Sequence, residues 1–334
     1  MNVLCFGEPL VRLATSAHER LEEAHILELD YSGAEVAVAI SLAQQGEKVS
    51  FVTKLASNRL GSNALMTLSK YGINTSKVLR SNERMGIYYK ERGKSIRPTI
   101  VTYDRTGSAL ACAKSNDFDW DHILNGIEIV FLSGIMPAIS AEMAEASLNC
   151  LCACKERGIR TVFDINYRRS MWLPHEAQIA FEKLFPYIDI LTASEDDIVL
   201  LNDKSIKKDE MFRFCLDWMS TTRRKFDMDY AAFVVRRVNN RDCATFQGAL
   251  ITNDSEAFLS QEREAAISDL SGTGSMFSAG ILHAILSKWD MQFVVDYSVQ
   301  SSALKATIRG DYSVATESEI ARVMTNTSQL TTIQ

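Results

Sequence analysis

The amino-acid sequence predicts an α/β protein with a mostly parallel central sheet that helices cover on both faces. Apolar, β-branched runs alternate with longer amphipathic stretches along most of the chain. Short buried strands separated by helices are typical of such a sheet. No internal repeat, low-complexity tract or linker marks a second independent domain. We therefore predict a single domain over residues 1–334.

The elements of this sheet can be placed in chain order. The expected strands are Val3–Phe6, Val49–Thr53, Ile129–Ser133, Thr161–Asp164, Ile188–Thr192 and Phe233–Arg236. The expected helices are Glu35–Gln45, Ala64–Tyr71, Ala141–Arg157, Pro174–Leu184, Lys208–Met219 and Gly274–Leu286. In open α/β sheets ligands lie beyond the carboxyl ends of the strands, so functional residues are expected in the loops there.

Two segments, at about residues 9–33 and 84–107, depart from this alternation. Both are rich in strand-forming residues and are bounded by Gly and Pro. We expect them to form a small secondary sheet that projects from the main domain. An exposed sheet face attracts partners, so a ligand or a second subunit should cover it. The sequence thus favours a homodimer formed through this projecting sheet.

Composition excludes several classes of protein. Charged residues make up 23% of the 334 residues and the net charge is -6, which argues against a long disordered region and against a nucleic-acid binder. No uncharged apolar run approaches about 18 residues, so no membrane span is expected. The segment Met1–Glu8 has no basic region and is interpreted as a first strand rather than a signal peptide. We expect a cytoplasmic protein whose seven cysteines are reduced thiols.

Three of the cysteines, Cys150, Cys152 and Cys154, resemble a possible metal cluster. They lie in a stretch with helical character, where their spacing turns Cys152 away from the other two. No other Cys or His is nearby in sequence to complete a site. We interpret them as small buried hydrophobic residues.

The segment Asp269–Gly280 carries the most chemical information. Small residues at 271–275 open a predicted helix, and the unpaired N–H groups of a helix start form an anion site. Gly272 and Gly274 would let a phosphate approach without interference from a Cβ atom. Helices also begin with Gly and Ser for capping alone, so this segment by itself leaves both interpretations open. No P-loop is present, and Phe277 stands where a dinucleotide fingerprint needs a small residue.

Other motifs agree with a phosphate-binding function when they are taken together with Asp269–Gly280. They are Tyr31–Glu35 before an early helix, Asp164–Arg168 and Ser194–Asp197 after strands, and Ser301–Lys305 in the last long helix. In order and spacing, the chain resembles the ribokinase (PfkB) family of carbohydrate kinases, whose pattern includes Gly-Gly, Asp-x-Asn-x-Arg, Asn-x-x-Glu and Asp-Thr-x-Gly-Ala-Gly-Asp. The resemblance covers essentially the whole chain and implies a three-layer ribokinase-like fold with a small projecting β-sheet lid. It also implies ATP and Mg²⁺ as cofactors.

A closer likeness rests on the segments Met85–Tyr88, Tyr103–Ala109, Leu132–Ile135, Asp164–Trp172 and Ile308–Asp311. On these segments the chain most resembles the 2-keto-3-deoxygluconate kinases of that family, which phosphorylate a sugar acid. Arg105 and Arg168 can each pair with a carboxylate through two donors, and tyrosine hydroxyls suit sugar hydroxyls. Each arginine taken alone could equally form a surface ion pair. The sugar-acid contacts that the resemblance implies are Gly33, Tyr88, Tyr103, Arg105, Arg168 and Asp311.

The chain departs from the family pattern at the catalytic position. The last Asp of that pattern takes the proton of the attacking hydroxyl, and Ser275 stands in its place. A serine hydroxyl without a partner is not a base near neutral pH, and general-base help is typically worth about 10²–10⁴-fold. Phosphoryl transfer depends mainly on positioning and electrostatics, so a slow kinase is expected. The catalytic residues implied are Ser275 and the backbone of Gly272, Thr273 and Gly274.

The nucleotide side also departs from the family pattern. The family shows Gly-x-x-Gly after the strand that corresponds to Phe233–Arg236, whereas here Val238 follows Arg237, and valine does not readily adopt a positive φ. Asp197 matches the position that organises Mg²⁺ through water. The nucleotide contacts that the resemblance implies are Ser194, Arg236, Arg237, Gly272 and Gly274.

The sequence therefore predicts an ATP-dependent kinase of a 2-keto-3-deoxygluconate-like sugar acid, with slow turnover. The alternative is a catalytically silent sugar-acid sensor or regulatory protein that keeps the kinase fold. The substitutions cluster on the transfer and nucleotide side, at Ser275 and Val238, which favours this alternative. Neither a nucleic acid nor a membrane is an expected partner.

Overall fold

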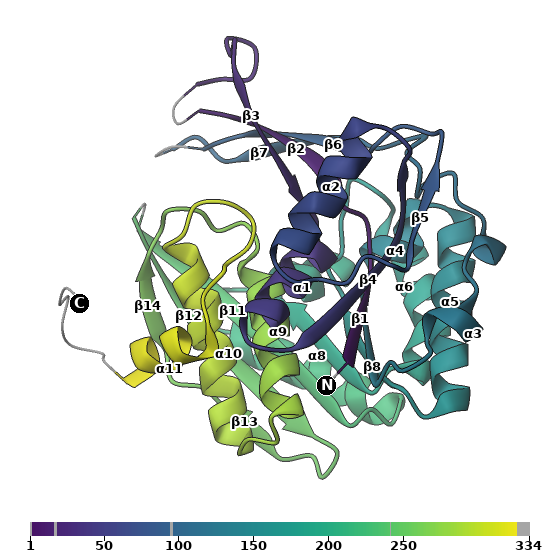
Figure 1. Ribbon diagram of the computed structural model, residues 1–334. Coiled ribbons are helices and arrows are strands. Elements are labelled where there is room, and N and C mark those ends of the chain that lie inside the picture. Colours follow the sequence, from purple (N-terminus) through teal and green to yellow (C-terminus); the bar gives the residue numbers. More distant parts are fainter. Residues whose placement is uncertain (1, 17–18, 94–95, 241, 326–334) are drawn as a thin grey trace.

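A ten-stranded, mostly parallel sheet runs through the centre of the protein (Figure 1). The computed structural model describes residues 2–16, 19–93, 96–240 and 242–325. The strand order is β13-β12-β11-β10-β9-β8-β1-β4-β5, with β14 also paired to β12. Pairs from β5 to β11 are parallel, whereas β12 pairs antiparallel with β11, β13 and β14. Its strands are β1 (Asn2–Phe6), β4 (Lys48–Ala56), β5 (Val78–Ser81), β8 (Ile129–Ser133), β9 (Arg160–Asp164), β10 (Ile190–Ser194), β11 (Tyr230–Asn240), β12 (Cys243–Thr252), β13 (Ala257–Leu259) and β14 (Arg263–Ala266).

Helices cover both faces of this sheet, as the sequence predicts. In β1, Val3 and Cys5 join one buried cluster, and Leu4 and Phe6 join the other, because successive side chains of a strand point to opposite faces. The first cluster lies under α1 (Ala34–Gln44), α9 (Thr273–Leu286) and α10 (Met291–Ala306), with α11 (Glu317–Thr325) against α10. The second lies under α3 (Trp120–Ile123), α4 (Ile135–Ile139), α5 (Ala141–Arg157), α6 (Pro174–Leu184), α7 (Glu195–Leu201) and α8 (Met211–Lys225). The predicted α/β fold class is thereby confirmed.

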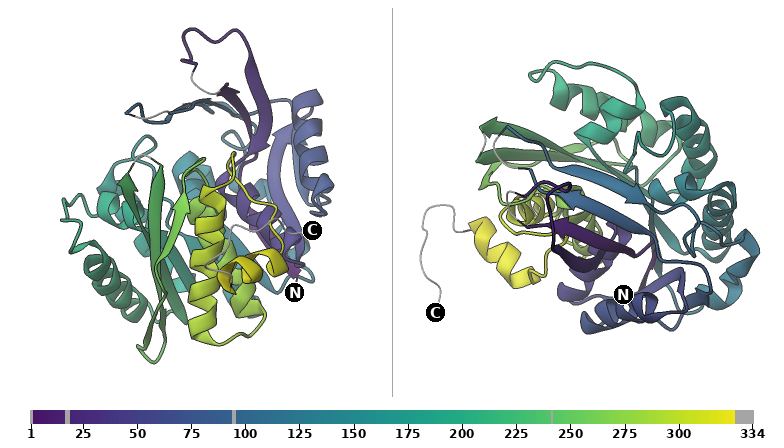
Figure 2. Two further views of the ribbon diagram at one scale, coloured as in Figure 1. Left: turned by 90° about the vertical axis from the view of Figure 1, so that its left-hand side faces the viewer. Right: turned by 90° about the horizontal axis from the view of Figure 1, so that it is seen from above.

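A second, four-stranded sheet projects from the main body (Figure 2), and we call it the lid sheet. It consists of β2 (Leu10–Thr15), β3 (Leu27–Ser32), β6 (Ile87–Glu91) and β7 (Ile100–Asp104), in the order β3-β2-β6-β7. Its two central strands, β2 and β6, pair in parallel, with Val11 opposite Ile87 and Ala14 opposite Lys90. The two segments that departed from the α/β alternation in the sequence therefore meet in one sheet.

Helix α2 (Arg59–Lys70) supports the lid sheet on one side. Val11 and Ile87 of the lid belong to a small apolar cluster with Ala64 of α2 and Leu55 of β4. Residues at alternate positions, Tyr88 and Lys90 among them, face the other way, towards the carboxyl ends of the main strands. The lid thus roofs the edge at which an α/β sheet binds ligands.

Strand β11 differs most from its expected length. The sequence predicts a strand over Phe233–Arg236, whereas β11 extends from Tyr230 to Asn240 and forms a hairpin with β12. Val238 remains in the ladder, with its Cα opposite that of Ala244, because valine fits extended backbone. The chain thus continues as a strand where a Gly-x-x-Gly segment would bend.

Candidate active site

The amino end of α9 forms one wall of the pocket beneath the lid. Gly272 precedes this helix with a φ of 77°, and no side chain caps the helix start. A Cβ on Gly272 would lie 1.9 Å from the backbone oxygen of Asp311, so only glycine fits there. A Cβ on Gly274 would meet nothing within 4 Å. The first turn of α9 therefore presents unblocked N–H groups to the pocket, the arrangement that binds an anion.

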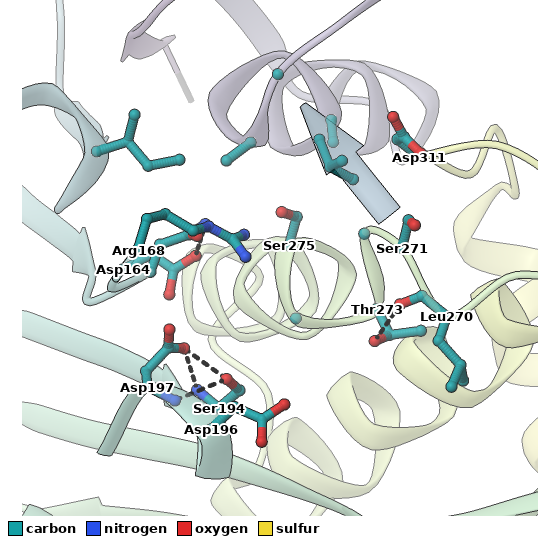
Figure 3. Close-up of a pocket in the computed structure, with 18 of the residues that line it drawn as sticks. Asp164, Arg168, Ser194, Asp196, Asp197, Leu270, Ser271, Thr273, Ser275 and Asp311 are labelled. Atoms are coloured by element: carbon teal, nitrogen blue, oxygen red, sulfur yellow. Dashed lines mark hydrogen bonds between the residues drawn. The ribbon is translucent and has the colours of Figure 1, made fainter. Parts of the chain in front are cut away.

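Ser275 lies in this first turn. It is buried and lines the pocket. One turn further along α9, Ser278 Oγ lies 2.8 Å from Thr192 Oγ1 of β10. Thr192 is opposite Asp164 in the parallel ladder, and paired residues point to the same face of a sheet. The Asp164 carboxyl and the Ser275 hydroxyl therefore lie on the same side of the sheet and reach the same end of the pocket (Figure 3).

Asp164 and Asp197 are two buried carboxyl groups at this end of the pocket. Burial and the charge of Asp197 raise the pKa of Asp164 well above its usual value, and Arg168 acts in the opposite direction. Burial also raises the pKa of Asp197. Two carboxylates that repel each other in a buried site are a good environment for a cation.

Asn166 follows Asp164 at the carboxyl end of β9 and has a positive φ of 36°. Its amide donates a hydrogen bond to Asp164 at 3.3 Å. Its buried Oδ1 has no hydrogen-bond partner among the described residues. Asn166 lines the pocket, so this oxygen is available to a ligand there.

The start of α7 forms the nucleotide side of the pocket as the resemblance assigns it. Ser194 caps this helix, and its N–H and hydroxyl both donate to Asp197 Oδ2, at 2.9 and 2.5 Å. Burial raises the pKa of Glu195 to about 7. Arg236 pairs with Asp196 at 3.0 Å and reaches Thr273 Oγ1 at 3.4 Å, which connects α7 with the start of α9.

The lid contributes two tyrosines and an arginine. The rings of Tyr88 and Tyr103 lie 5.8 Å apart, and the Tyr88 hydroxyl donates to Asp311. Arg105 forms an ion pair with the buried carboxylate of Glu8, which also accepts a hydrogen bond from Ser108 at 2.6 Å. The Arg105 guanidinium is therefore held at the lid side of the pocket before any ligand binds.

Arg168 differs from Arg105. It is exposed at the end of the Asp164–Arg168 segment, and among the described residues it forms no ion pair within 4.0 Å. Figure 3 shows its guanidinium beside Asp164 and close to the first turn of α9. A carboxylate or phosphate in the pocket could thus take both donors of its fork.

All but one of the site residues expected from the sequence line one cavity of about 500 Å³. The exception is Arg237, which pairs with Glu262, because neighbouring residues of a strand point to opposite faces. The expected residues around the cavity are Gly33, Tyr88, Tyr103, Arg105, Arg168, Ser194, Asp197, Arg236, Gly272, Thr273, Gly274, Ser275 and Asp311.

The sequence did not indicate several other charged residues of the cavity. Glu8 lies two residues after the end of the first strand, and this position near a carboxyl end was the one available signal. Lys90 is only 2% exposed and carried no signal, because a charged residue on a strand is usually solvated. The cavity is also lined by Glu35, Asn166, Glu195 and Ser302, which lie in the segments that match the family pattern but were assigned no contact.

The cysteine cluster has no role in this site. Cys150 and Cys154 are buried and Cys152 is half-buried on α5, and none of the three lines the cavity. Across the described residues, no group of three or more His, Cys, Asp or Glu side chains is arranged to hold a metal ion. Within the same residues, no helix combines the length and the hydropathy that a membrane crossing needs.

The fold and the cavity together define a ribokinase-like protein, in which a parallel sheet is roofed by a β-sheet lid over the start of a late helix. Residues 1–318 match the model of the pfkB family of carbohydrate kinases. The chain therefore belongs to the pfkB carbohydrate kinase family.

Individual relatives carry more specific names. The chain is 31% identical over 326 residues to a 2-dehydro-3-deoxygalactonokinase of Haloferax volcanii. The aligned residues make up 97% of this chain and 96% of the relative. It is similar to the crystal structure of 2-dehydro-3-deoxygluconokinase from Thermotoga maritima, with a TM-score of 0.92, 32% identity and coverage of 98% of this chain and 100% of that one. A PfkB family carbohydrate kinase from Listeria grayi has a TM-score of 0.88 and 29% identity, with coverage of 98% and 100%.

Proposed function

We propose that this protein transfers a phosphoryl group from ATP to a 2-keto-3-deoxygluconate-like sugar acid. The observation that carries the proposal is the placement of Arg105 and Arg168 around the same cavity as the uncapped start of α9. Two guanidinium groups suit the carboxylate of a sugar acid, and the helix start suits a phosphate. The names of the Haloferax volcanii and Thermotoga maritima relatives also support a deoxy sugar acid as substrate.

Each side of the cavity then has a task in the reaction. Tyr88, Tyr103 and Asp311 offer hydrogen bonds to sugar hydroxyls beneath the lid. The N–H groups after Gly272 face the transferred phosphoryl group, where preorganised donors stabilise the developing charge. Arg236, which connects Asp196 with Thr273, stands where it can meet the other phosphates.

The buried carboxyl groups fit Mg²⁺. This ion is usually held by one or two carboxylates together with substrate phosphates and water. Asp164 and Asp197 provide two such groups. Burial and the charge of Asp197 raise the pKa of Asp164, and a divalent cation would offset both effects. When bound, the ion would neutralise phosphate charge. Asp197 would contact it through Oδ1 or water, because Oδ2 accepts the bonds from Ser194.

Ser275 sets the expected rate. No ionisable side chain stands at the position from which the family removes the proton, so positioning and charge stabilisation carry the reaction. We therefore expect transfer that is slower than in a kinase with Asp at this position.

We also propose that the chain forms a single domain over residues 1–334, with lid segments at about 9–33 and 84–107.

A silent sugar-acid sensor is the second candidate. The observation that favours it is β11, which continues as a strand through Val238 where family members bend around the nucleotide. The residues that the resemblance assigns to the sugar acid, by contrast, all line the cavity.

Calorimetric titration of Mg·ATP and, separately, of 2-keto-3-deoxygluconate distinguishes the two candidates. Binding of both ligands, followed by ADP release in a coupled assay, supports the kinase. Binding of the sugar acid without the nucleotide supports the sensor. A lack of transfer to any member of a wide panel of sugar acids would remove the enzyme proposal.

We also propose a homodimer formed through the lid sheet and a cytoplasmic location. Apolar side chains stay exposed on or beside the lid strands, which is unusual unless a partner covers them. Light scattering coupled to size exclusion tests this proposal, with Ile100→Glu expected to produce monomers. The exposed side chains include Ile26 (80%), Leu29 (52%), Ile96 (83%) and Ile100 (50%).

A further inference from the structure

A buried lysine connects the lid sheet to the phosphate-binding side of the cavity. Lys90 lies in β6, one of the two central lid strands, and is only 2% exposed. Its ammonium group donates to Asp269 Oδ2 at 2.8 Å, to Ser271 Oγ at 2.8 Å and to Asp311 Oδ1 at 2.7 Å. All three of its protons therefore have an acceptor.

The three acceptors lie outside the lid. Asp269 and Ser271 belong to the segment that leads directly into the Gly272 turn and α9. Asp311 follows α10, and its backbone oxygen is the group against which Gly272 packs. One ammonium group thus fixes both segments that shape the turn at the start of α9.

The same carboxylates are tied to the sugar side. Asp311 accepts the hydroxyl of Tyr88, two residues from Lys90 on the same face of β6. Lys90 and Tyr88 both line the cavity. A ligand that orders this face of β6 therefore orders Lys90 as well.

A purely structural ion pair does not explain this arrangement well. Burying an ammonium group is costly, and a buried ion pair is often no more stabilising than apolar residues of similar volume. Two further cations, Arg12 and Lys305, already contact Asp311 or the backbone of Asp269. The position of Lys90, between the two halves of the cavity, instead suggests a functional role.

We propose that Lys90 is a positioning residue that couples sugar-acid binding beneath the lid to phosphate binding at the Gly272–Gly274 turn. The inference rests on the proposed kinase function and deepens it. Sugar acid that contacts β6 stabilises the Lys90 ammonium in the position where it holds Asp269, Ser271 and Asp311, and hence the N–H groups of α9. By linkage, nucleotide binding must tighten sugar-acid binding by the same factor.

The test measures the dissociation constant of Mg²⁺ with a non-hydrolysable ATP analogue, with and without saturating 2-keto-3-deoxygluconate. The ratio of the two constants reports the coupling. We expect a ratio of roughly 5–150 for the unchanged protein, the usual range of coupling between sites. In Lys90→Met the ratio should fall to about 1, whereas Lys90→Arg should retain part of it.

Two further variants separate coupling from general damage. Lys54→Met removes another lysine ion pair, formed with Asp117 at 2.8 Å, from a residue that does not line the cavity, and it should leave the ratio unchanged. Ser271→Ala removes one acceptor of Lys90 without changing charge and should lower the ratio, so the test remains decisive if Lys90→Met does not fold.

The outcomes separate this inference from the proposed function. A folded Lys90→Met protein with an unchanged ratio overturns the inference and leaves the kinase function standing. A ratio of 1 in the unchanged protein, with both ligands bound, does the same. Failure of the unchanged protein to bind the nucleotide overturns the proposed function, and the inference with it.

Discussion

The hydroxyl of Tyr88 donates a hydrogen bond to the carboxylate of Asp311, 223 residues later in the chain. The first residue belongs to a lid strand and the second to the loop that supports the turn before α9. Both residues line the cavity, and Figure 3 shows Asp311 on the side away from Asp164 and Arg168. The cavity is therefore shaped by segments from both ends of the chain, and variants on either segment should affect the same ligands.

Replacing Ser275 with Asp should raise kcat by about 10²–10⁴-fold, because a carboxylate restores a general base beside the attacking hydroxyl. The measurement is steady-state ADP release with saturating Mg·ATP and 2-keto-3-deoxygluconate. Ser275→Asn is the matched control, since it has a similar size and no basic group. An equal gain in both variants would show that size rather than basicity matters.

The two glycines at the start of α9 should respond differently to Ala. Gly272→Ala should lower the free energy of unfolding by at least about 1–2 kcal/mol, because its φ of 77° disfavours a Cβ that also meets Asp311. Gly274→Ala should fold normally, because its Cβ meets nothing within 4 Å, yet lower kcat at least about tenfold by obstructing the phosphate. Urea unfolding and kcat measured on both variants test this contrast.

Replacing Arg168 with Met should raise the KM for the sugar acid about 10- to 150-fold, the equivalent of a lost charged hydrogen bond of about 1.5–3 kcal/mol. The neighbouring Arg169 is a matched control, since it is 57% exposed and pairs with Asp203 at 2.5 Å. Arg169→Met should leave the KM unchanged. A similar loss with a substrate analogue that lacks the carboxylate would contradict the assigned contact.

Replacing Lys90 with Met should reverse the pH dependence that Asp269 and Asp311 give to the free energy of unfolding. Burial alone would raise the pKa of Asp269 and Asp311, but the Lys90 ammonium, helped by Lys305 at Asp269 and by Arg12 at Asp311, holds both below their usual value. With folded-state pKa values below those of the unfolded chain, both groups stabilise the unchanged protein above about pH 4, and this contribution is lost as pH falls through the folded-state values.

In Lys90→Met, burial should raise these pKa values above those of the unfolded chain. The folded protein then binds the extra protons, so its stability falls as pH rises. The difference from the unchanged protein should grow from small at about pH 4 to about 3–5 kcal/mol at pH 7, the usual effect of breaking a buried pair. Urea unfolding across this range tests the sign, and Lys54→Met, whose ion pair is more exposed, should show a weaker trend.

Local patterns were sufficient to predict most of the framework. The bounds of β8, α5 and α6 match the expected ranges, because their apolar periodicity and caps are local. The two lid segments were recognised by strand-forming residues that broke the α/β alternation. The hairpin of β11 and β12 was not expected. The predicted strand ended at Arg236, whereas Arg237 and Val238 also remain in the ladder with β12.

The sequence predicts site residues only where residues that are neighbours in the chain form the site together. The Gly272–Gly274 turn is such a case. The pairing of Glu8 with Arg105 and of Lys90 with Asp269 joins residues 97 and 179 positions apart, and no local pattern indicates which charged residues will meet. Arg236 and Arg237 were both assigned to the nucleotide. Neighbouring residues of a strand point to opposite faces, so the sequence alone could have shown that only one of them would line the cavity.

The lid sheet has a consequence for protein engineering. Its central strands β2 and β6 pair in parallel, yet β4 and α2 of the main body lie between them in the chain. The lid therefore cannot be exchanged as one contiguous cassette. A graft intended to change substrate choice must replace both segments together, because a new β6 has to match the side chains of the old β2 at Val11, Arg12 and Ala14.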